Sequence, residues 1–282
     1  MKKFLAKSIG RLDFFAWVLV LFFFGGSSLF SGGDTLLAFV GAAAIIVEMM
    51  LIGFAIEIII ECLKNTRGIG TLTGFITNGP EAVCLVVGLL VGDIIFAAST
   101  PLGSNFMNPL LLIAAAIICR RLKKTFSVHK LYSLITITTT ASMAGIFFLL
   151  RPYHYSVWLL VCAAITVVLF FLRPREHHNE EVEEYSFRPA LWFVPAIAVL
   201  TLSGYYLDPV VSFAAIHSHA PKGVIGFIVL ATLTSWPEFK SCLSLINRGK
   251  YLAAILNITV SNITNIWLAA VGIGSYLLLG LR

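Results

Sequence analysis

The chain has 282 residues, of which 59% are hydrophobic and 12% are charged. This composition excludes a water-soluble domain, because the chain would expose more apolar surface than its polar residues could offset. The net charge of +6 does not indicate a nucleic-acid partner, since the basic residues fall in the gaps between apolar runs. We therefore expect membrane lipid and inorganic cations as partners, and no nucleic acid.

Nine apolar runs are long enough to form membrane-spanning helices, each of which needs about 20 residues to cross the hydrocarbon layer. In chain order they are 14–31, 36–63, 69–91, 93–119, 131–150, 156–172, 189–215, 222–247 and 251–281. Several are longer than one crossing requires, so tilted or broken helices are expected. The predicted fold class is an all-α polytopic membrane protein.

The first run follows the basic start MKKFLAK and has features of both a cleaved signal peptide and a retained first span. We favour the retained span because the distribution of charge agrees with it. With the N-terminus in the cytoplasm, sixteen of the twenty Lys and Arg residues fall in cytoplasmic segments and three fall outside. The C-terminus is then outside. We expect an integral protein of a prokaryotic plasma membrane.

The longest hydrophilic segment, residues 173–188, contains the acidic sequence HHNEEVEE. We interpret it as a solvated cytoplasmic linker. It separates an N-terminal transmembrane half, residues 1–172, from a C-terminal transmembrane half, residues 189–282. The first half contains repeat 1, at about 69–120, and the second contains repeat 2, at about 222–281.

These two repeats align without a gap when the chain is shifted by 157 positions. The shift aligns Pro80–Glu81 with Pro237–Glu238, and it aligns SNFMN (104–108) with SNITN (261–265). Chance does not readily supply both matches in one register. The first Pro-Glu span is the third and the second is the eighth, so the repeats cross the membrane in opposite directions. Inverted repeats of this kind are typical of secondary transporters, whose sites lie near the midplane.

Each repeat supplies the oxygen atoms that a hard cation such as Ca²⁺ prefers. Polar side chains recur at i, i+4 spacing on one helix face, and each proline frees a backbone carbonyl. A carboxylate at the bilayer centre costs about 2.5 kcal/mol or more unless a cation or protons compensate it. The candidate cation ligands are Glu81, Glu238, Asn108, Asn265, Ser104, Ser261, Thr77 and Thr234.

At these residues the sequence resembles the cation/Ca²⁺ exchanger superfamily, which includes the sodium/calcium exchangers. The segments that carry the likeness are ITNGPE (76–81) with GSNFMN (103–108), and LTSWPE (233–238) with VSNITN (260–265). The resemblance implies that Glu81 and Glu238 ligate the cation and accept the exchanged protons, with the other candidates completing the site. Asparagine at both Asn108 and Asn265 is similar to the Ca²⁺/H⁺ branch, whereas sodium-driven members commonly have an acidic residue at one of these positions.

The resemblance implies a secondary active antiporter that exchanges Ca²⁺, or a related divalent cation, for H⁺ by alternating access. Two alternatives stay open: Na⁺-coupled Ca²⁺ exchange, and a non-transporting cation sensor or scaffold on the same fold. No permanently bound cofactor is expected. An intramembrane protease is disfavoured, because neither a pair of catalytic aspartates nor a serine with a histidine at membrane depth can be assigned.

Two further expectations concern residues outside the motifs. Glu48, near the middle of the second span, is a candidate for lining a proton or cation path, because an ionisable side chain inside the membrane is a functional candidate by default. Familiar members of the superfamily have two more helices after the second SNxxN helix. We expect partner helices or a second copy of the chain to take their place.

Overall fold

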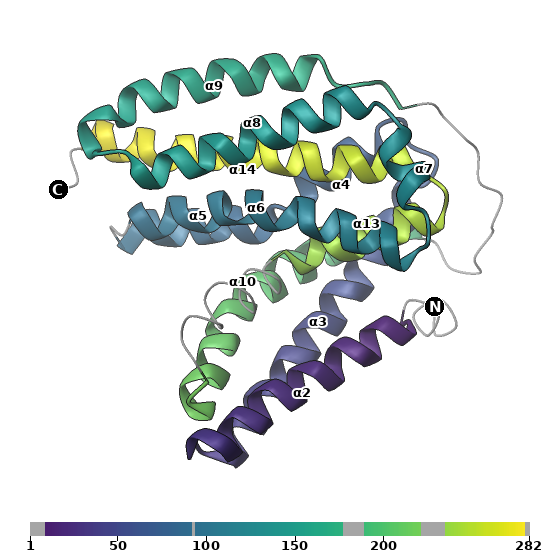
Figure 1. The fold of residues 1–282 in the computed structure, drawn as a ribbon, viewed down its shortest axis with the longest axis vertical. Coiled ribbons are helices and arrows are strands. Elements are labelled where there is room, and N and C mark those ends of the chain that lie inside the picture. Colours follow the sequence, from purple (N-terminus) through teal and green to yellow (C-terminus); the bar gives the residue numbers. More distant parts are fainter. Residues whose placement is uncertain (1–8, 92–93, 177–188, 221–234, 280–282) are drawn as a thin grey trace. The chain divides into compact units, whose positions relative to one another are not determined.

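The computed structural model describes residues 9–91, 94–176, 189–220 and 235–279. All regular elements in these ranges are helices (Figure 1). Seven are long and apolar enough to cross a membrane, and each corresponds to one predicted span. They are α2 (Arg11–Ser31), α3 (Thr35–Leu63), α6 (Ile94–Ile118), α8 (Lys130–Leu149), α9 (Tyr155–Phe171), α10 (Phe193–Ser218) and α14 (Tyr251–Leu279). The predicted all-α polytopic membrane fold is therefore confirmed.

The third predicted span consists of two helices, α4 (Ile69–Ile76) and α5 (Gly79–Val91), with a break at Thr77 and Asn78. Pro80 lies in the first turn of α5, where its missing backbone N–H leaves no helical hydrogen bond unmade. A continuous helix would lack that bond to the carbonyl of Ile76, so the break falls where proline favours one.

Of the eighth predicted span, 222–247, the described part is α13 (Trp236–Asn247), and residues 222–234 lie outside the described ranges. Three short helices connect the longer ones: α7 (Leu122–Ser127), η1 (Pro152–His154) and η2 (Pro189–Trp192).

The chain forms two compact units. The first comprises residues 1–62 and 181–237, and the second comprises residues 63–180 and 238–282. Each unit therefore combines segments from both predicted halves of the sequence, 1–172 and 189–282.

The first unit contains α2, α3 and α10. Gly32 ends α2 in the left-handed conformation, with φ of 70°, which is accessible to glycine at little cost. The N–H of Asp34 then donates to the carbonyl of His217 at 2.8 Å. Further along α3, a Cβ on Gly41 would lie 2.7 Å from the Cβ of Ala214, so glycine permits close packing of α3 and α10.

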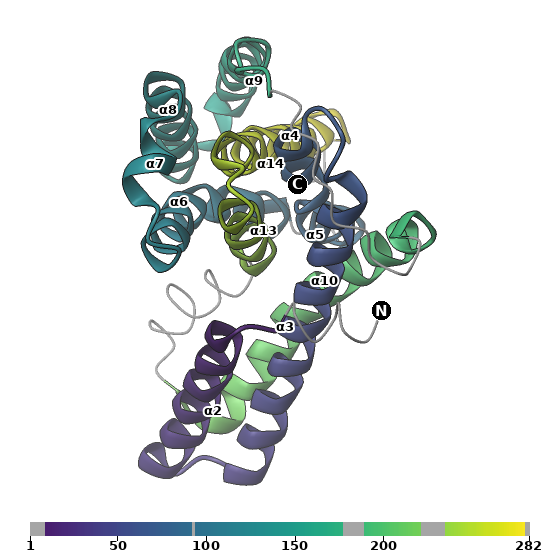
Figure 2. The same cartoon turned by 90° about the vertical axis from the view of Figure 1, so that its right-hand side faces the viewer.

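The second unit is organised around α14, which contacts α4, α5, α6, α7, α8 and α9 (Figure 2). Helix α4 approaches α14 closely because Gly70 and Gly74, four residues apart, face it. A Cβ on Gly70 would collide with the backbone of Ala253, and one on Gly74 would lie 2.7 Å from the carbonyl oxygen of Asn257. Small residues at this spacing allow two membrane helices to pack backbone against backbone.

The buried face of α14 changes character along its length. Its middle portion carries polar side chains, among them Ser261, Asn262 and Asn265, all with no exposed surface. The portion after Asn265 is apolar, and its side chains pack against α6, α8 and α9. This apolar cluster comprises Leu102, Met143, Ala144, Phe147, Trp158, Cys162, Ile266, Ala269 and Ile273. The fold thus places a polar region beside an apolar one within the same helix bundle.

Candidate cation site

The two glutamates of the repeats lie at equivalent positions in the second unit. Glu81 is in the first turn of α5 and Glu238 is in the first turn of α13, where a carboxylate interacts favourably with the helix dipole. Glu81 is 2% exposed and Glu238 has no exposed surface. The two carboxyl groups are close enough to interact electrostatically.

Each glutamate contacts the serine of its own repeat. Ser104 on α6 donates to Oε1 of Glu81 at 3.4 Å, and Ser261 on α14 donates to Oε1 of Glu238 at 3.2 Å. The members of these pairs are separated by the same number of residues, 23. The two repeats therefore share a local structure as well as a sequence motif.

The asparagines join the two repeats. Nδ2 of Asn108 donates to Oδ1 of Asn262 at 3.0 Å, and Nδ2 of Asn265 donates to Oδ1 of Asn105 at 3.2 Å. In the two bonds, donor and acceptor come from the same two motif positions, but the repeat that donates in one bond accepts in the other. Reciprocal contacts of this kind are what a two-fold relation between α6 and α14 requires. We call these four side chains the asparagine lattice.

Ser261 and Asn78 connect the lattice to the break between α4 and α5. Nδ2 of Asn78 donates to the backbone carbonyl of Ser261 at 2.9 Å, and Oδ1 of Asn78 accepts from the Ser261 hydroxyl at 2.8 Å. The same hydroxyl oxygen accepts a bond from Nδ2 of Asn108 at 3.1 Å. Ser261 thus contacts both repeats.

Four buried oxygens at this site make no hydrogen bond within the described part of the chain. They are Oε2 of Glu81, Oε2 of Glu238, Oδ1 of Asn108 and Oδ1 of Asn265. A buried acceptor without a partner typically costs about 1–3 kcal/mol. These oxygens come in two equivalent pairs, and carboxylate and amide oxygens are the ligands that hard cations prefer. These oxygens are therefore candidate cation ligands, and a bound cation would compensate that cost.

The remaining candidates lie in different parts of the chain. Thr77 is buried at the C-terminal end of α4, beside the break, and Thr234 lies outside the described residues. Glu48 belongs to the other compact unit, where it is half-buried and its Oε2 has no hydrogen-bond partner among the described residues. Its role in an ion path stays a prediction.

Three residues of the site were not among the sequence-based candidates: Asn78, Asn105 and Asn262. The motif contained a signal for each. Asn105 and Asn262 are the second residue of SNxxN in both repeats, and Asn78 aligns with Ser235, which is also polar. A polar residue kept at the same motif position in both repeats was therefore informative even without i, i+4 spacing to the glutamate.

The chemistry of the site is that of oxygen ligands. Within the described ranges, no three His, Cys, Asp or Glu residues come together as a metal-binding group. A cation here would be held by two carboxylates together with amide and hydroxyl oxygens, a set that suits Ca²⁺ or Na⁺ better than a transition metal.

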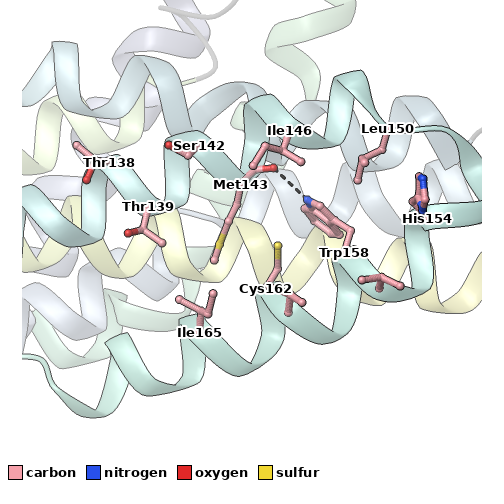
Figure 3. Close-up of a pocket in the computed structure, with 12 residues that line it drawn as sticks. Thr138, Thr139, Ser142, Met143, Ile146, Leu150, His154, Trp158, Cys162 and Ile165 are labelled. Carbon is pink, nitrogen blue, oxygen red and sulfur yellow. Dashed lines mark hydrogen bonds between the residues drawn. The ribbon is translucent and has the colours of Figure 1, made fainter.

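A separate pocket of about 570 Å³ lies between α8 and α9 (Figure 3). Its lining is mainly apolar, and the indole N–H of Trp158 donates to the carbonyl of Met143 there at 3.0 Å. None of the described candidate ligands lines it. The pocket is therefore distinct from the candidate cation site.

Comparison with known proteins gives one family match. Residues 189–280 match the family model described as "Sodium/calcium exchanger protein". Neither the curated proteins nor the solved structures contain a match to the chain. The matched segment contains Glu238 and the second SNxxN motif, and the described helices include seven that could cross a membrane. Residues 189–280 are thus similar to the sodium/calcium exchanger family of membrane transporters.

Proposed function

We propose that the protein is a secondary active antiporter that exchanges Ca²⁺, or a related divalent cation, for H⁺ at the site between Glu81 and Glu238. The observation that carries the proposal is the set of four buried oxygens without partners, on Glu81, Asn108, Glu238 and Asn265. They occupy equivalent positions in both repeats, and the family match covers the second repeat.

Charge balance supports exchange rather than simple binding. Two ionised carboxylates inside the membrane are costly, by about 2.5 kcal/mol or more for each charge near the bilayer centre. One divalent cation neutralises both Glu81 and Glu238, and so do two protons. The two loaded states are then nearly neutral, whereas an empty site with both groups ionised is penalised. The protein can therefore change its accessible side when loaded and resists doing so when empty.

The choice of protons over sodium rests on Asn108 and Asn265. Neutral residues at both positions leave two carboxylates, which match one Ca²⁺ or two protons in charge. Sodium-coupled exchange remains the alternative, and it is distinguished by the ion that drives uptake. We further propose that the N-terminus faces the cytoplasm, because the basic residues are concentrated in the segments that this orientation places inside.

The test is Ca²⁺ uptake into vesicles that contain the purified protein. We expect a pH gradient to drive uptake, and a Na⁺ gradient at fixed pH to drive none. The variants Glu81→Gln and Glu238→Gln should each abolish uptake, because an amide cannot supply the lost charge or bind the exchanged proton. Glu57→Gln, in α3 of the other unit, is the matched control and should retain it.

Three outcomes would contradict parts of the proposal. Uptake that is unchanged in Glu81→Gln and Glu238→Gln would exclude the site. Uptake driven by Na⁺ instead of by pH would replace the proposed coupling. Calorimetric binding of Ca²⁺ with no flux under either gradient would identify a sensor rather than an antiporter.

A further inference from the structure

A second line of buried polar side chains extends from the site along α8, which lies outside both repeats. The buried face of this helix is polar in its first half and apolar in its second half. Its buried residues, in order, are Ser133, Thr136, Thr140, Met143, Ala144 and Phe147. In a helix that contacts lipid, hydroxyls on the inward face are not needed for solubility, so their restriction to one half requires another explanation.

Thr140 connects this line to the site. Its hydroxyl oxygen accepts a hydrogen bond from Nδ2 of Asn262 at 3.3 Å, and both residues have no exposed surface. Asn262 belongs to the asparagine lattice and accepts from Asn108 through its Oδ1. The buried hydroxyls in the first half of α8 therefore lead to the asparagine lattice beside the glutamates.

Tyr132 and Thr136 continue the line toward the start of α8. Tyr132, Thr136 and Thr140 follow one another at i, i+4 spacing, which places them on one face of the helix. The hydroxyl of Tyr132 lies near those of Thr136 and of Thr259 on α14. Neither the Tyr132 hydroxyl nor the buried Thr136 hydroxyl has a hydrogen-bond partner within the described part of the chain. We call Tyr132, Thr136 and Thr140 the hydroxyl line.

The polar side chains of the line continue in one direction only. Beyond Thr140, the inward face of α8 consists of Met143, Ala144 and Phe147, which belong to the apolar cluster with Leu102 and Ile266. At the other end, α8 begins at Lys130, in a segment that the charge distribution predicts to be cytoplasmic. A polar route therefore leads from the predicted cytoplasmic end to the site and stops there.

The side chains along this route favour a proton over a divalent cation. The positive charge of Arg173 interacts electrostatically with Tyr132, and Lys130 is the first residue of α8. The three residues of the line offer hydroxyls and no carboxylate. A divalent cation needs six to eight oxygens to replace its water, more than three hydroxyls supply. A proton needs only groups that can both accept and donate, which hydroxyls and water do.

We propose that the hydroxyl line is the route by which protons pass between the predicted cytoplasmic end of α8 and the glutamate site. Residues at i and i+4 are about 5–6 Å apart, so a water molecule between successive hydroxyls completes the chain. Each hydroxyl accepts a proton on one side and releases its own on the other. Because the amide nitrogen of Asn262 cannot accept a proton, a water molecule makes the last transfer from Thr140 to a glutamate, so one proton enters and one leaves. The charged or titratable groups at the outer part of the route are Tyr132, Arg173, Lys130, His129 and Glu176, and Glu81 and Glu238 are those at its inner end. The direction of proton movement rests on the proposed exchange function, whereas hydration of the line does not.

The first experiment tests hydration independently of transport. Cysteine is placed by Thr136→Cys or Thr140→Cys, and the matched control is Thr138→Cys. Thr138 lies on the same helix but faces the apolar pocket between α8 and α9 (Figure 3). Vesicles are treated with a small water-soluble methanethiosulfonate, and peptide mass spectrometry separates the new thiol from the native cysteines. We expect positions 136 and 140 to react at least about tenfold faster than position 138, because thiolate forms only where water reaches.

The second experiment measures proton movement. Valine replaces threonine with nearly the same shape and without the hydroxyl. We expect Thr136→Val to slow Ca²⁺-driven proton release about tenfold, the rate equivalent of one lost hydrogen bond, with Ca²⁺ binding by calorimetry unchanged. Thr136→Ser should restore the rate and Thr138→Val should not alter it.

The two experiments separate the possible failures. If position 136 reacts no faster than position 138, or if Thr136→Val releases protons at the original rate, the proton route is wrong. If the thiols at 136 and 140 react as expected but the unmodified protein exchanges no ions, the hydrated line stands and the antiporter function fails. Loss of Ca²⁺ binding in Thr136→Val would show a structural role for the hydroxyl and would also overturn the route.

Discussion

Asn105 and Asn262 each donate a side-chain hydrogen bond to the backbone carbonyl of the other residue, at 3.2 and 3.4 Å. These residues are 157 positions apart and occupy the same place in the two SNxxN motifs. The pair therefore lies where the two-fold relation between the repeats brings equivalent residues into contact. Because each amide bonds to backbone, the pairing joins helices α6 and α14 directly.

The first prediction concerns this pair. Asn105→Ala and Asn262→Ala should each lower the free energy of unfolding by about 1–3 kcal/mol, because each leaves buried partners unsatisfied. The double variant should lose about the sum of the two, since each amide bonds to a backbone carbonyl that the other substitution leaves in place. Unfolding of the detergent-solubilised protein provides the measurement. A combined loss far from the sum would show that the two amides act as a coupled pair.

A second prediction concerns the close contact of α4 with α14. Gly70→Ala should destabilise the protein by about 1–3 kcal/mol, because the added methyl group meets the backbone of Ala253 and the helices must separate. Gly103→Ala in α6 is the control, since a Cβ there meets nothing within 4 Å. It should be neutral or stabilising by about 0.5–1 kcal/mol through the lower flexibility of alanine. Equal effects of the two changes would contradict the packing described.

Ser261 provides a third prediction, which depends on the proposed function. Its hydroxyl contacts Glu238, Asn78 and Asn108, so it positions groups from both repeats. Ser261→Ala should weaken Ca²⁺ binding by about tenfold, the equivalent of one lost hydrogen bond. Ser261→Thr, which keeps the hydroxyl, should bind more tightly than the alanine variant. Calorimetry with Ca²⁺ tests both, and equal affinities for the two variants would exclude a role of the hydroxyl.

The pH dependence of stability leads to a fourth prediction, at Glu176 in the predicted linker. Its carboxylate accepts bonds from the N–H groups of Gly70 and Thr71, at 3.1 to 3.2 Å. Burial nevertheless raises the pKa of Glu176 above its ordinary value of 4.5, against the opposing effects of these bonds and of Lys250 and Arg173.

A carboxyl whose pKa is raised by folding keeps its proton in the folded state after the unfolded chain has lost it. Glu176 should therefore reduce stability as pH rises from 4.5 through its raised pKa. Unfolding temperatures of the unmodified protein and of Glu176→Gln, compared from about pH 4 to pH 7, test this. The unmodified protein should lose stability relative to the variant as pH rises. A relative gain would show that the bonds to α4 outweigh burial.

The fifth prediction follows from charge balance at Glu81 and Glu238. If one Ca²⁺ exchanges for two protons, no net charge crosses the membrane. Uptake should then be insensitive to membrane potential, whereas each net charge moved would change the driving force by about 2.3 kcal/mol per 100 mV. Vesicles with an imposed potassium diffusion potential provide the measurement. A clear effect of the potential on Ca²⁺ accumulation would contradict electroneutral exchange.

The features that could be predicted from the sequence are those that a single physical constraint determines. Apolar length predicted the seven long helices, because a backbone in lipid must satisfy its own hydrogen bonds. Proline predicted a disturbance near Pro80, and the structure places the break at Thr77 and Asn78. Repetition of Pro-Glu and SNxxN identified the glutamates and asparagines that the fold brings together.

Contacts that depend on three-dimensional pairing could not be predicted in this way. The bonds of Asn78 to Ser261 and of Asn262 to Thr140 join residues that are 183 and 122 positions apart. Nothing in their local sequence indicates the partner. The hydroxyl line could not be predicted because a single threonine in a membrane helix most often bonds to its own backbone, as Thr138 does to Leu134 and Thr140 does to Thr136. Burial, which the sequence does not display, distinguishes Thr136 from Thr138.

The mutual bonds of Asn105 and Asn262 also restrict how the molecule can rearrange. Sliding of α6 along α14 would break both of these bonds to backbone at once and leave buried polar groups without partners. If the protein changes access as proposed, these two helices should stay in register while other helices move. The same asparagine, repeated in both halves of the chain, would then keep α6 and α14 fixed and leave the movement to the surrounding helices.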